Sequence, residues 1–490
     1  MTKKTRGILA AGHPDTASAG LQMLELGGNA YDAALAAMLT SFVSEASLTS
    51  MGGGGFMNVY TANGWSCLFD FFVQTPIVRR SMNEVDFRES FINFGTKQQR
   101  QFSGKASVAV PGCPAGLFHI HQRLGSLPMK EIIQPAVKLA REGVVITPYQ
   151  AYSLFILEPI LMEKPETAAV YGRDGETFKT GERMRMWAYA DTLELLAKEG
   201  VRAFYEGEIG TTWTKDNALH GGSVSREDLL AYQVVERTPL TFSYHDHLLL
   251  TNPAPSAGGS LIVHGLEQLG LATPKVTATQ GRAYVERMMA VMQQMEAYRK
   301  LRIKDLSPGN TTHLSVLDEH GNAASLTTTV GGASGELIPY TGIQTNNMLG
   351  ELDLFPGGVY QWPTNQRVSS MMSPTIVLHK GQPNIVLGSG GSSRIRTAIL
   401  QVVSFLIDHH LDLQEAVNHP RLHWEAGQLN LEPGLVSSET ALSVSSENIM
   451  HWQEANMYFG GVHTVVRKAD GRLLGGADAR RAGVVRTNVV

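Results

Sequence analysis

Apolar and polar residues recur along this chain with two different spacings, one typical of helices and one typical of strands. At residues 16–26 and 31–45 the apolar positions follow the helical spacing, and Gly27, Gly28 and Asn29 interrupt the pattern. A glycine in the left-handed conformation commonly ends a helix. These two segments are therefore predicted to form a helical hairpin.

A run of four glycines at 52–55 precedes two segments, 56–60 and 66–72, that are rich in β-branched and aromatic residues. They predict a pair of strands. Residues 112–302 then show mainly helical patterns, with one strand expected near residues 245–250. Helices are expected at 134–142, 190–198, 226–233 and 280–301.

After residue 303 the pattern changes to short β-type runs, separated by turn residues at 319–322 and 380–382. A helix is expected at 397–409, and strands are expected at 314–318, 323–329, 375–379 and 385–387. Antiparallel strands mixed with helices predict an α+β fold in which helices cover the sheets. The polar segment 304–310, which contains proline and glycine, is the best candidate for a break between the helix-rich part of the chain and the part that follows it.

Length and charge exclude several classes of protein. A chain of 490 residues with 43% hydrophobic residues and a net charge of −4 predicts a globular protein of about three domains or one large composite fold, without a nucleic-acid-binding surface. It contains no apolar run of about 18 residues, and the apolar run before Gly12 is too short for an export signal. Only Cys67 and Cys113 occur, which favours a reducing, cytoplasmic location and excludes a cysteine-rich metal site.

The segment with the most informative candidate catalytic residues runs from Asn310 through Thr311, Thr312 and His313 to residue 318. A threonine hydroxyl is a weak nucleophile unless a base lies beside it. An N-terminal threonine carries its own base, because a free α-amine has a pKa of about 7.7–8.0. For Thr311 to work in this way, the amine must first be liberated from the backbone.

These residues, followed by the threonines at 327–329, resemble the start of the small subunit of γ-glutamyltranspeptidases. Further matches occur in the family's order over essentially the whole chain, among them 27–30, 52–57, 110–112, 255–259, 369–375 and 475–481. The resemblance implies a four-layer αββα N-terminal-nucleophile hydrolase fold. It also implies that the chain cleaves itself between Asn310 and Thr311 and that residues 1–310 and 311–490 stay associated as a heterodimer of large and small subunits. Pairing of two such heterodimers is left open.

The resemblance also implies roles for single residues. Thr329, eighteen positions after Thr311, matches a threonine that hydrogen-bonds the nucleophile, although it also suits a strand simply as a β-branched residue. Gly391 and Ser392 match two glycines whose backbone N–H groups stabilise the oxyanion. The glycine-rich loop lacks the lysine and spacing of a phosphate-binding loop. Ser369 and Ser370 match a serine pair that contacts the substrate α-carboxylate, but turn serines before a strand are also common.

The substrate pocket departs from the family's pattern. Phe72 stands where the family has an arginine for the α-carboxylate, and a phenyl ring cannot replace a bidentate guanidinium. Met348 replaces a glutamine and Glu351 an aspartate, while the asparagine that follows Thr329 is deleted or replaced by Gly331. Glu351 can still pair with an ammonium group. We therefore expect a pocket of apolar character that accepts an N-acyl amide, a modified γ-glutamyl conjugate or a biosynthetic intermediate.

The sequence thus predicts a self-processing amidohydrolase that forms an acyl-enzyme on Thr311, which water or an amine resolves. Its substrate is a small-molecule amide or a γ-glutamyl compound of the kind met in glutathione metabolism. One alternative is an acylase or pathway hydrolase acting on a non-γ-glutamyl substrate, and another is an inactive ligand-binding pseudoenzyme. No cofactor, metal, membrane or nucleic-acid partner is expected. His409 and His410 suit a solvated helix end, and His313 is interpreted as structural.

Overall fold

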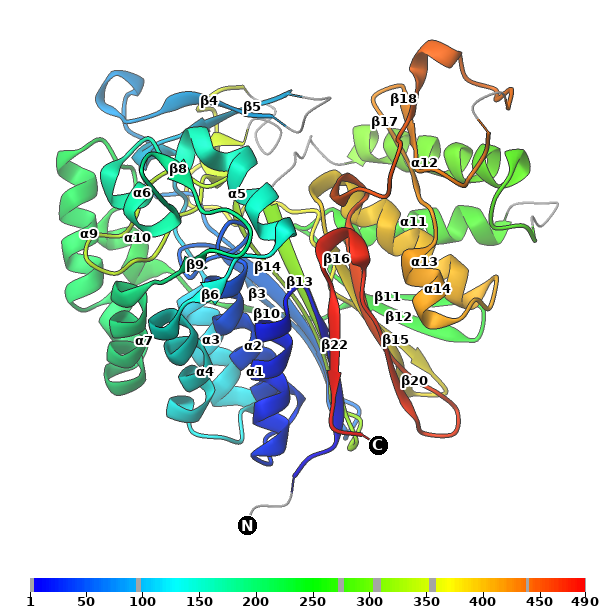
Figure 1. Ribbon diagram of the computed structural model, residues 1–490, viewed down its shortest axis with the longest axis horizontal. Coiled ribbons are helices and arrows are strands. Elements are labelled where there is room, and N and C mark those ends of the chain that lie inside the picture. Colours follow the sequence, from blue (N-terminus) through cyan, green and yellow to red (C-terminus); the bar gives the residue numbers. More distant parts are fainter. Residues whose placement is uncertain are drawn as a thin grey trace.

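Two stacked β-sheets lie between two layers of helices in the computed structural model (Figure 1). The structure describes residues 4–93, 98–271, 277–302, 310–351, 358–437 and 440–489. Both sheets contain strands from the two sides of the predicted break, so residues before and after it fold as one unit. The α+β class and the four-layer order of helices, sheet, sheet and helices are as expected from the sequence.

The first sheet has seven strands. In spatial order they are β10 (Val235–Arg237), β3 (Ser66–Phe71), β2 (Gly54–Tyr60), β14 (Ala323–Gly331), β13 (Asn310–Asp318), β1 (Gly7–Ala11) and β22 (Val484–Thr487). The two central strands, β13 and β14, are antiparallel neighbours, and every residue in them is buried. Both faces are covered because helices pack on one side and the second sheet on the other.

The second sheet has six strands and packs against the first through β16 and β20. In spatial order its strands are β11 (Leu240–Tyr244), β12 (His247–Thr251), β15 (Thr375–His379), β16 (Gln382–Gly390), β20 (Gly461–Arg467) and β21 (Leu473–Gly476). Its outer face is covered by α11 (Gly258–Leu271), α12 (Arg282–Arg302), α13 (Ile395–Ile407) and α14 (Leu413–Asn418), as Figure 1 shows.

On the outer side of the first sheet, α1 (Pro14–Glu25) and α2 (Ala30–Ser44) form the predicted hairpin. Gly27 has a φ of 87°, as its role after a helix end requires, and Asn29 caps α2 through the backbone N–H of Asp32. All 15 residues of α2 are buried, because α2 lies between the sheet and α4 (Met129–Glu142). Its many alanines allow this close approach on every side.

Shorter elements complete the helical layer. They are α3 (Cys113–Leu124), α5 (Pro148–Leu161), α6 (Pro165–Tyr171), α7 (Trp187–Glu199), α8 (Arg202–Tyr205), α9 (Glu208–Leu219) and α10 (Arg226–Ala231). The small sheets pair β4 (Arg88–Asn93) with β5 (Gln98–Ser103), β6 (Val144–Val145) with β9 (Arg183–Met184), and β7 (Gly172–Arg173) with β8 (Glu176–Thr177). A further sheet contains β17 (Leu422–Glu425), β18 (Gln428–Leu431) and β19 (Ile449–His451).

Several boundaries differ from the sequence expectations. The strand expected at 245–250 begins at His247, because His245, with a φ of 52°, and Asp246 form the turn between β11 and β12. The helix expected at 226–233 ends at Ala231. Strands β1 and β22 were not anticipated, since neither shows a clear alternation. Residues 304–309 of the predicted break lie outside the described residues.

Across the described ranges, none of the helices combines the length and the apolar character needed to span a membrane.

Candidate active site

Thr311 lies near the start of β13, in the middle of the first sheet. Its Cα partner across the antiparallel ladder is Thr329 of β14, and the register shifts between Asn310 and Thr311. Asn310, Thr311 and Thr329 are all buried, with exposed fractions of 7%, 3% and 3%. The sequence run therefore folds into a strand that holds the two threonines side by side and bends the backbone at the bond between residues 310 and 311.

The hydroxyl of Thr329 donates a hydrogen bond to the backbone carbonyl oxygen of Asn310. The backbone N–H of Gly331 donates to the same hydroxyl at 3.0 Å, which leaves the hydroxyl proton for the carbonyl. A hydrogen bond to a carbonyl oxygen withdraws electrons from the carbonyl carbon. The carbonyl that precedes Thr311 is thus the one that Thr329 polarises.

The side chains of β13 alternate between two environments. Thr312 faces the helices and donates to Glu45 at 2.5 Å, whereas His313 packs against Gly388 of the second sheet. His313 contacts the hydroxyls of Thr327 and Ser315 at 2.8 and 2.9 Å, and burial holds its pKa well below the usual value. These contacts fit the interpretation of His313 as structural, which stays a prediction, and by the alternation of a strand Thr311 faces the second sheet like His313.

The loop after β16 meets the backbone of Thr311. A Cβ atom on Gly390 would lie 2.2 Å from the carbonyl oxygen of Thr311, so only glycine fits there. Gly391 and Ser392 follow with φ values of 119° and 61°, and within the described residues the buried Ser392 hydroxyl has no hydrogen-bond partner. The structure thus brings the loop predicted to hold the oxyanion up to the predicted nucleophile.

A buried arginine completes this side of the site. The guanidinium of Arg481 donates to the carbonyl oxygen of Thr311 at 3.1 Å and to that of Met457 at 3.2 Å, and it lies 3.4 Å from the hydroxyl of Tyr149. In the sequence, Arg481 belongs only to the family motif at 475–481, which implied no role for it. Nothing in its local pattern shows that the end of the chain returns to β13.

Arg481 is held in place by an ion-pair cluster beside it. Asp478 contacts Arg421 at 2.7 Å and Arg480 at 3.1 Å, and Arg480 also pairs with Glu432. Burial alone would raise the pKa of Asp478, but the two arginines and backbone N–H groups outweigh it and hold the pKa at about 2. The carboxylate therefore stays charged and fixes the turn that carries Arg481.

On the helical side, Glu45 lies at the end of α2 with 2% of its surface exposed. Its carboxyl group accepts hydrogen bonds from Thr312 at 2.5 Å and from Thr16 at 2.9 Å. Burial raises the pKa of Glu45 to about 7, although these hydrogen bonds and Arg481 oppose the rise. A titratable group thus lies next to the strand of Thr311. Its sequence context gives no signal for this, because a glutamate at a helix end is common.

The predicted substrate residues Met348 and Glu351 lie at the end of β14. A Cβ atom on Gly331, whose φ is 73°, would lie 2.6 Å from Oε1 of Glu351 and 3.4 Å from Cε of Met348. Gly331 is two positions from Thr329. Both predicted substrate residues therefore lie close to the paired threonines, and both are buried.

Phe72 directly follows β3 and is packed on its neighbours. Its ring stacks on Phe56 at a centroid distance of 5.4 Å, and its backbone lies against Gly54, the Cα partner of Thr329. Arg367 lies nearby but is engaged elsewhere. Its guanidinium lies 2.7 Å from the Tyr232 hydroxyl and 3.5 Å from the Asp70 carboxylate.

Ser369 and Ser370 occupy a turn before β15. The Ser369 hydroxyl donates to the carbonyl of Pro255 at 2.5 Å, and the Ser370 hydroxyl accepts from the N–H of Met372 at 3.0 Å. Ser256 donates to the carbonyl of Ser370 at 2.7 Å. These contacts fit the alternative interpretation of Ser369 and Ser370 as turn residues. Contact of this serine pair with the α-carboxylate of a substrate stays a prediction.

The two cysteines are free and buried. Burial raises the pKa of the Cys67 thiol to about 12 and also raises that of Cys113. A thiolate is the reactive form of cysteine, so neither residue is suited to act as a nucleophile.

Comparison with known proteins gives consistent matches over the whole chain. The family model described as Gamma-glutamyltranspeptidase matches residues 16–308 and 293–487. The chain is 31% identical to the acylase ACY 1 proenzyme of Pseudomonas sp. (strain V22), with 98% of this chain and 93% of that protein covered. It is 28% identical to the glutathione hydrolase proenzyme of Escherichia coli (strain K12), with 97% and 90% covered.

Among solved structures, the cephalosporin acylase from Bacillus halodurans has a TM-score of 0.84 to this chain at 24% sequence identity. The match covers 99% of this chain and 96% of that chain. The likeness extends through both sheets and both helical layers, so the two proteins share one fold.

Proposed function

The chain belongs to the γ-glutamyltranspeptidase family, a family of hydrolases and transpeptidases, and from that premise we propose that it is a self-processing amide hydrolase or acyltransferase with Thr311 as its nucleophile. The observation that carries the proposal is the hydrogen bond from Thr329 to the carbonyl oxygen of Asn310. Two relatives named proenzymes support the idea that the chain is made as a precursor.

In processing, Oγ of Thr311 adds to the carbonyl carbon of Asn310, and the C–N bond between the two residues breaks. The Asn310 acyl group is then held as an ester on Oγ, while the former amide nitrogen takes up a proton and becomes the α-amine of Thr311. Water hydrolyses the ester and leaves a carboxylate on Asn310. The Thr329 hydroxyl supports this step because it stabilises negative charge on the attacked oxygen.

In turnover, the liberated amine of Thr311 takes the proton from its own Oγ, which attacks the carbonyl carbon of the substrate amide. The N–H groups of Gly391 and Ser392 stabilise the oxyanion, and the leaving amine receives the proton. Water or a second amine then resolves the acyl ester. Arg481 supports this cycle, since a buried cation at the Thr311 carbonyl disfavours an ammonium form of the neighbouring amine.

We propose that the acyl group of the substrate presents an apolar face to Phe72 and Met348. Both side chains are 2% exposed, and both belong to one apolar cluster. Because Arg367 is engaged with Asp70 and Tyr232, it does not replace the missing carboxylate-binding arginine. This favours the acylase alternative over an ordinary γ-glutamyl substrate. Glu351, whose Oε1 lies beside Gly331, is the acidic residue that we propose meets an amino group of the substrate.

Processing is tested with the wild type, Thr311→Ala and Thr329→Ala, followed by denaturing electrophoresis and N-terminal sequencing. The wild type is expected to give two fragments, the smaller starting at Thr311, while Thr311→Ala stays whole. Loss of one hydroxyl that stabilises the oxyanion should slow cleavage in Thr329→Ala by about 10²–10³-fold. Thr328→Ala is the matched control, because its hydroxyl faces Thr49 on the other side of β14.

A wild-type chain that is never cut would support the pseudoenzyme alternative instead, and cleavage of Thr311→Ala would exclude Thr311 as the nucleophile.

The substrate proposal is tested by comparing γ-glutamyl-p-nitroanilide with aromatic acyl amides on the cleaved protein. Turnover of the acyl amides is expected. Robust turnover of the γ-glutamyl compound alone would contradict an apolar acyl pocket.

A further inference from the structure

A second group of chemically active side chains lies in the other sheet, at the turn between β11 and β12. Asp246, His247 and His379 each offer one ligand atom, and these three atoms lie within 4.8 Å of one another. Asp246 and His247 also line a cavity of about 690 Å³ between this turn and helices α11 to α13. None of the residues assigned to the Thr311 site lines this cavity.

The strand pairing brings the two histidines together. His247 starts β12 and His379 ends β15, and the two are Cα partners in the antiparallel ladder. Their ring centroids are 4.8 Å apart. The carboxylate of Asp246 lies 2.8 Å from Nδ1 of His247 and 3.3 Å from Nδ1 of His379. One carboxylate and two imidazole nitrogens therefore converge from a turn and two strands.

The polar contacts of these nitrogens are incomplete. Although both Nδ1 atoms lie close to the Asp246 carboxylate, both are buried and neither makes a hydrogen bond of acceptable geometry within the described residues. Buried ring nitrogens normally have a partner. Two imidazole nitrogens that approach one carboxylate from neighbouring strands match the arrangement of ligands around an ion.

The surroundings also supply an outer contact. The side chain of Asn384 lies beside His247, and its amide nitrogen donates to the carbonyl of Arg467 at 2.8 Å. This leaves the amide oxygen of Asn384 to accept from an imidazole N–H. Histidines that bind metals commonly donate their second ring N–H to an oxygen in this way, which fixes the tautomer.

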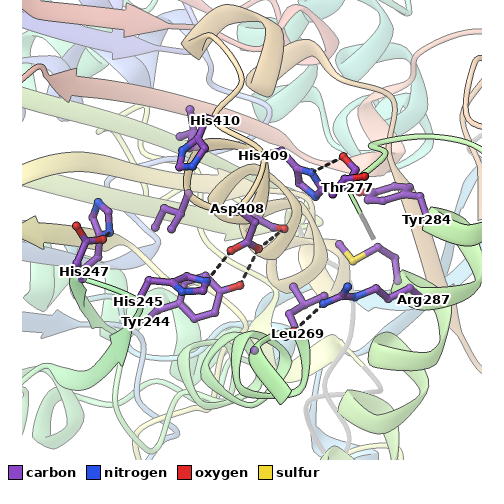
Figure 2. A pocket seen from close by; sticks show the side chains of 16 residues that line it. Tyr244, His245, His247, Leu269, Thr277, Tyr284, Arg287, Asp408, His409 and His410 are labelled. Carbon is purple, nitrogen blue, oxygen red and sulfur yellow. Dashed lines mark hydrogen bonds and ion pairs between the residues drawn. The ribbon is translucent and has the colours of Figure 1, made fainter. Parts of the chain in front are cut away.

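Two neighbouring histidines in the cavity, His245 and His409, have other partners. Asp408 accepts from the Tyr244 hydroxyl at 2.7 Å and contacts Nε2 of His245 at 2.9 Å, while Nδ1 of His409 lies 3.2 Å from the carbonyl of Thr277. Figure 2 shows Asp408 joined to Tyr244 and His245, His409 joined to Thr277, and His247 apart from both. Among the residues that the structure describes, Asp246, His247 and His379 form the group of histidine and carboxylate side chains whose ligand atoms lie within 4.8 Å of one another.

We propose that Asp246, His247 and His379 bind a divalent transition-metal ion of the zinc type. Two imidazoles and one carboxylate suit Zn²⁺, with water in the fourth position, whereas Mg²⁺ and Ca²⁺ prefer ligand sets made of oxygen. His247 precedes the cleavage point and His379 follows it. If the chain is cleaved as proposed above, the ion links the two fragments, and only this consequence rests on the proposed function.

Binding is tested on untagged, chelator-treated full-length protein by calorimetric titration with ZnCl₂ and by metal analysis after dialysis. The wild type is expected to bind one Zn²⁺ per chain at this site. His379→Gln and Asp246→Asn are each expected to weaken binding by at least about tenfold. His410→Asn is the control, since His410 lines the same cavity and asparagine tolerates its φ of 54°.

Asp246 and His379 are partly exposed, so their variants are expected to fold, and matching melting temperatures without metal would verify this. Equal zinc binding by the wild type and both variants would overturn the proposal, as would no binding by the wild type. If the site is real, Zn²⁺ also raises the urea concentration that separates the cleaved fragments in the wild type but not in His379→Gln. An uncut wild-type chain would defeat the processing proposal while the zinc titration still decides the site.

Discussion

At the scale of single residues, the site depends on groups whose surroundings change their chemistry. Thr329 is an ordinary strand residue by sequence, yet its hydroxyl lies on the one carbonyl that self-cleavage would attack. Arginine usually lies on the protein surface, yet only 5% of the surface of Arg481 is exposed, and its guanidinium contacts the Thr311 backbone.

Removing the charge of Arg481 should change how activity depends on pH. A nearby cation lowers the pKa of an amine, so in Arg481→Met the free amine of Thr311 should hold its proton more strongly. The acid limb of kcat/KM against pH, measured on the cleaved fraction, is expected to move up by about one unit. Arg481→Lys keeps the charge and should move it less. An acid limb that stays in place while activity falls would indicate a purely structural role.

Glu45 should make stability depend on pH. Its pKa is raised from 4.5 to about 7 in the folded state. Below pH 4.5 the carboxyl is protonated in both the folded and the unfolded state, so it does not lower the free energy of unfolding there. Between about pH 4.5 and 7 the unfolded chain releases the proton of this carboxyl while the folded state keeps it, so the folded state loses roughly 3 kcal/mol relative to the unfolded chain over this interval, and the loss is complete above pH 7. We expect Glu45→Gln to unfold at higher urea concentration than its parent at pH 8 and to differ little at pH 5.

The comparison is best made in the uncut Thr311→Ala background, so that one continuous chain unfolds. The glutamine keeps an acceptor for Thr312 and Thr16, and the difference therefore reports the charge. An identical change in stability between pH 5 and pH 8 in both proteins would show that Glu45 does not titrate in this range.

At the scale of elements, the site is a contact between the end of β16 and the start of β13. Gly390→Ala should disrupt this contact, because the added Cβ would lie 2.2 Å from the Thr311 carbonyl oxygen, and a backbone atom cannot easily move away. A loss of about 1–3 kcal/mol in the free energy of unfolding is expected, together with slower processing. Urea unfolding and the rate of fragment formation measure the two effects.

Gly270→Ala is the matched control for this change. Gly270 lies in α11, where the nearest atom to an added Cβ is 3.9 Å away on the ring of Tyr244. Alanine has the higher helix propensity, so this variant should be as stable as the wild type or more stable. If both alanine variants behave alike, the tight approach of the β16 loop to Thr311 is not what limits substitution at Gly390.

At the scale of the whole molecule, cleavage should leave the protein assembled. In the first sheet β13 lies between β14 and β1, and in the second β12 pairs with β15, so both ladders join residues on the two sides of position 310. The cleaved protein is expected to elute as one species in size-exclusion chromatography and to separate only in denaturant. A fragment 311–490 that elutes alone under native conditions would contradict this.

Much of the fold could be predicted because it is local. The α1–α2 hairpin, β2, β3, β13, β14 and β15 each show their own periodicity, and the turns at Gly27 and at 319–322 have the residue types that turns require. The adjacency of Thr311 and Thr329 followed from a family pattern in one hairpin. β1 and β22 are short and have no clear alternation of apolar and polar residues, so their sequences did not predict them.

The sequence by itself determined the elements, the order of the motifs and the residues with nucleophilic chemistry, since these depend on neighbours within a few positions. Only the tertiary structure decided that Glu45 meets Thr312, that Arg481 reaches Thr311 and that His247 lies opposite His379. Such contacts arise when distant strands share a hydrogen-bond register and bury a common face. The pKa of Glu45 likewise comes from the loss of water around it, which no stretch of residues encodes alone.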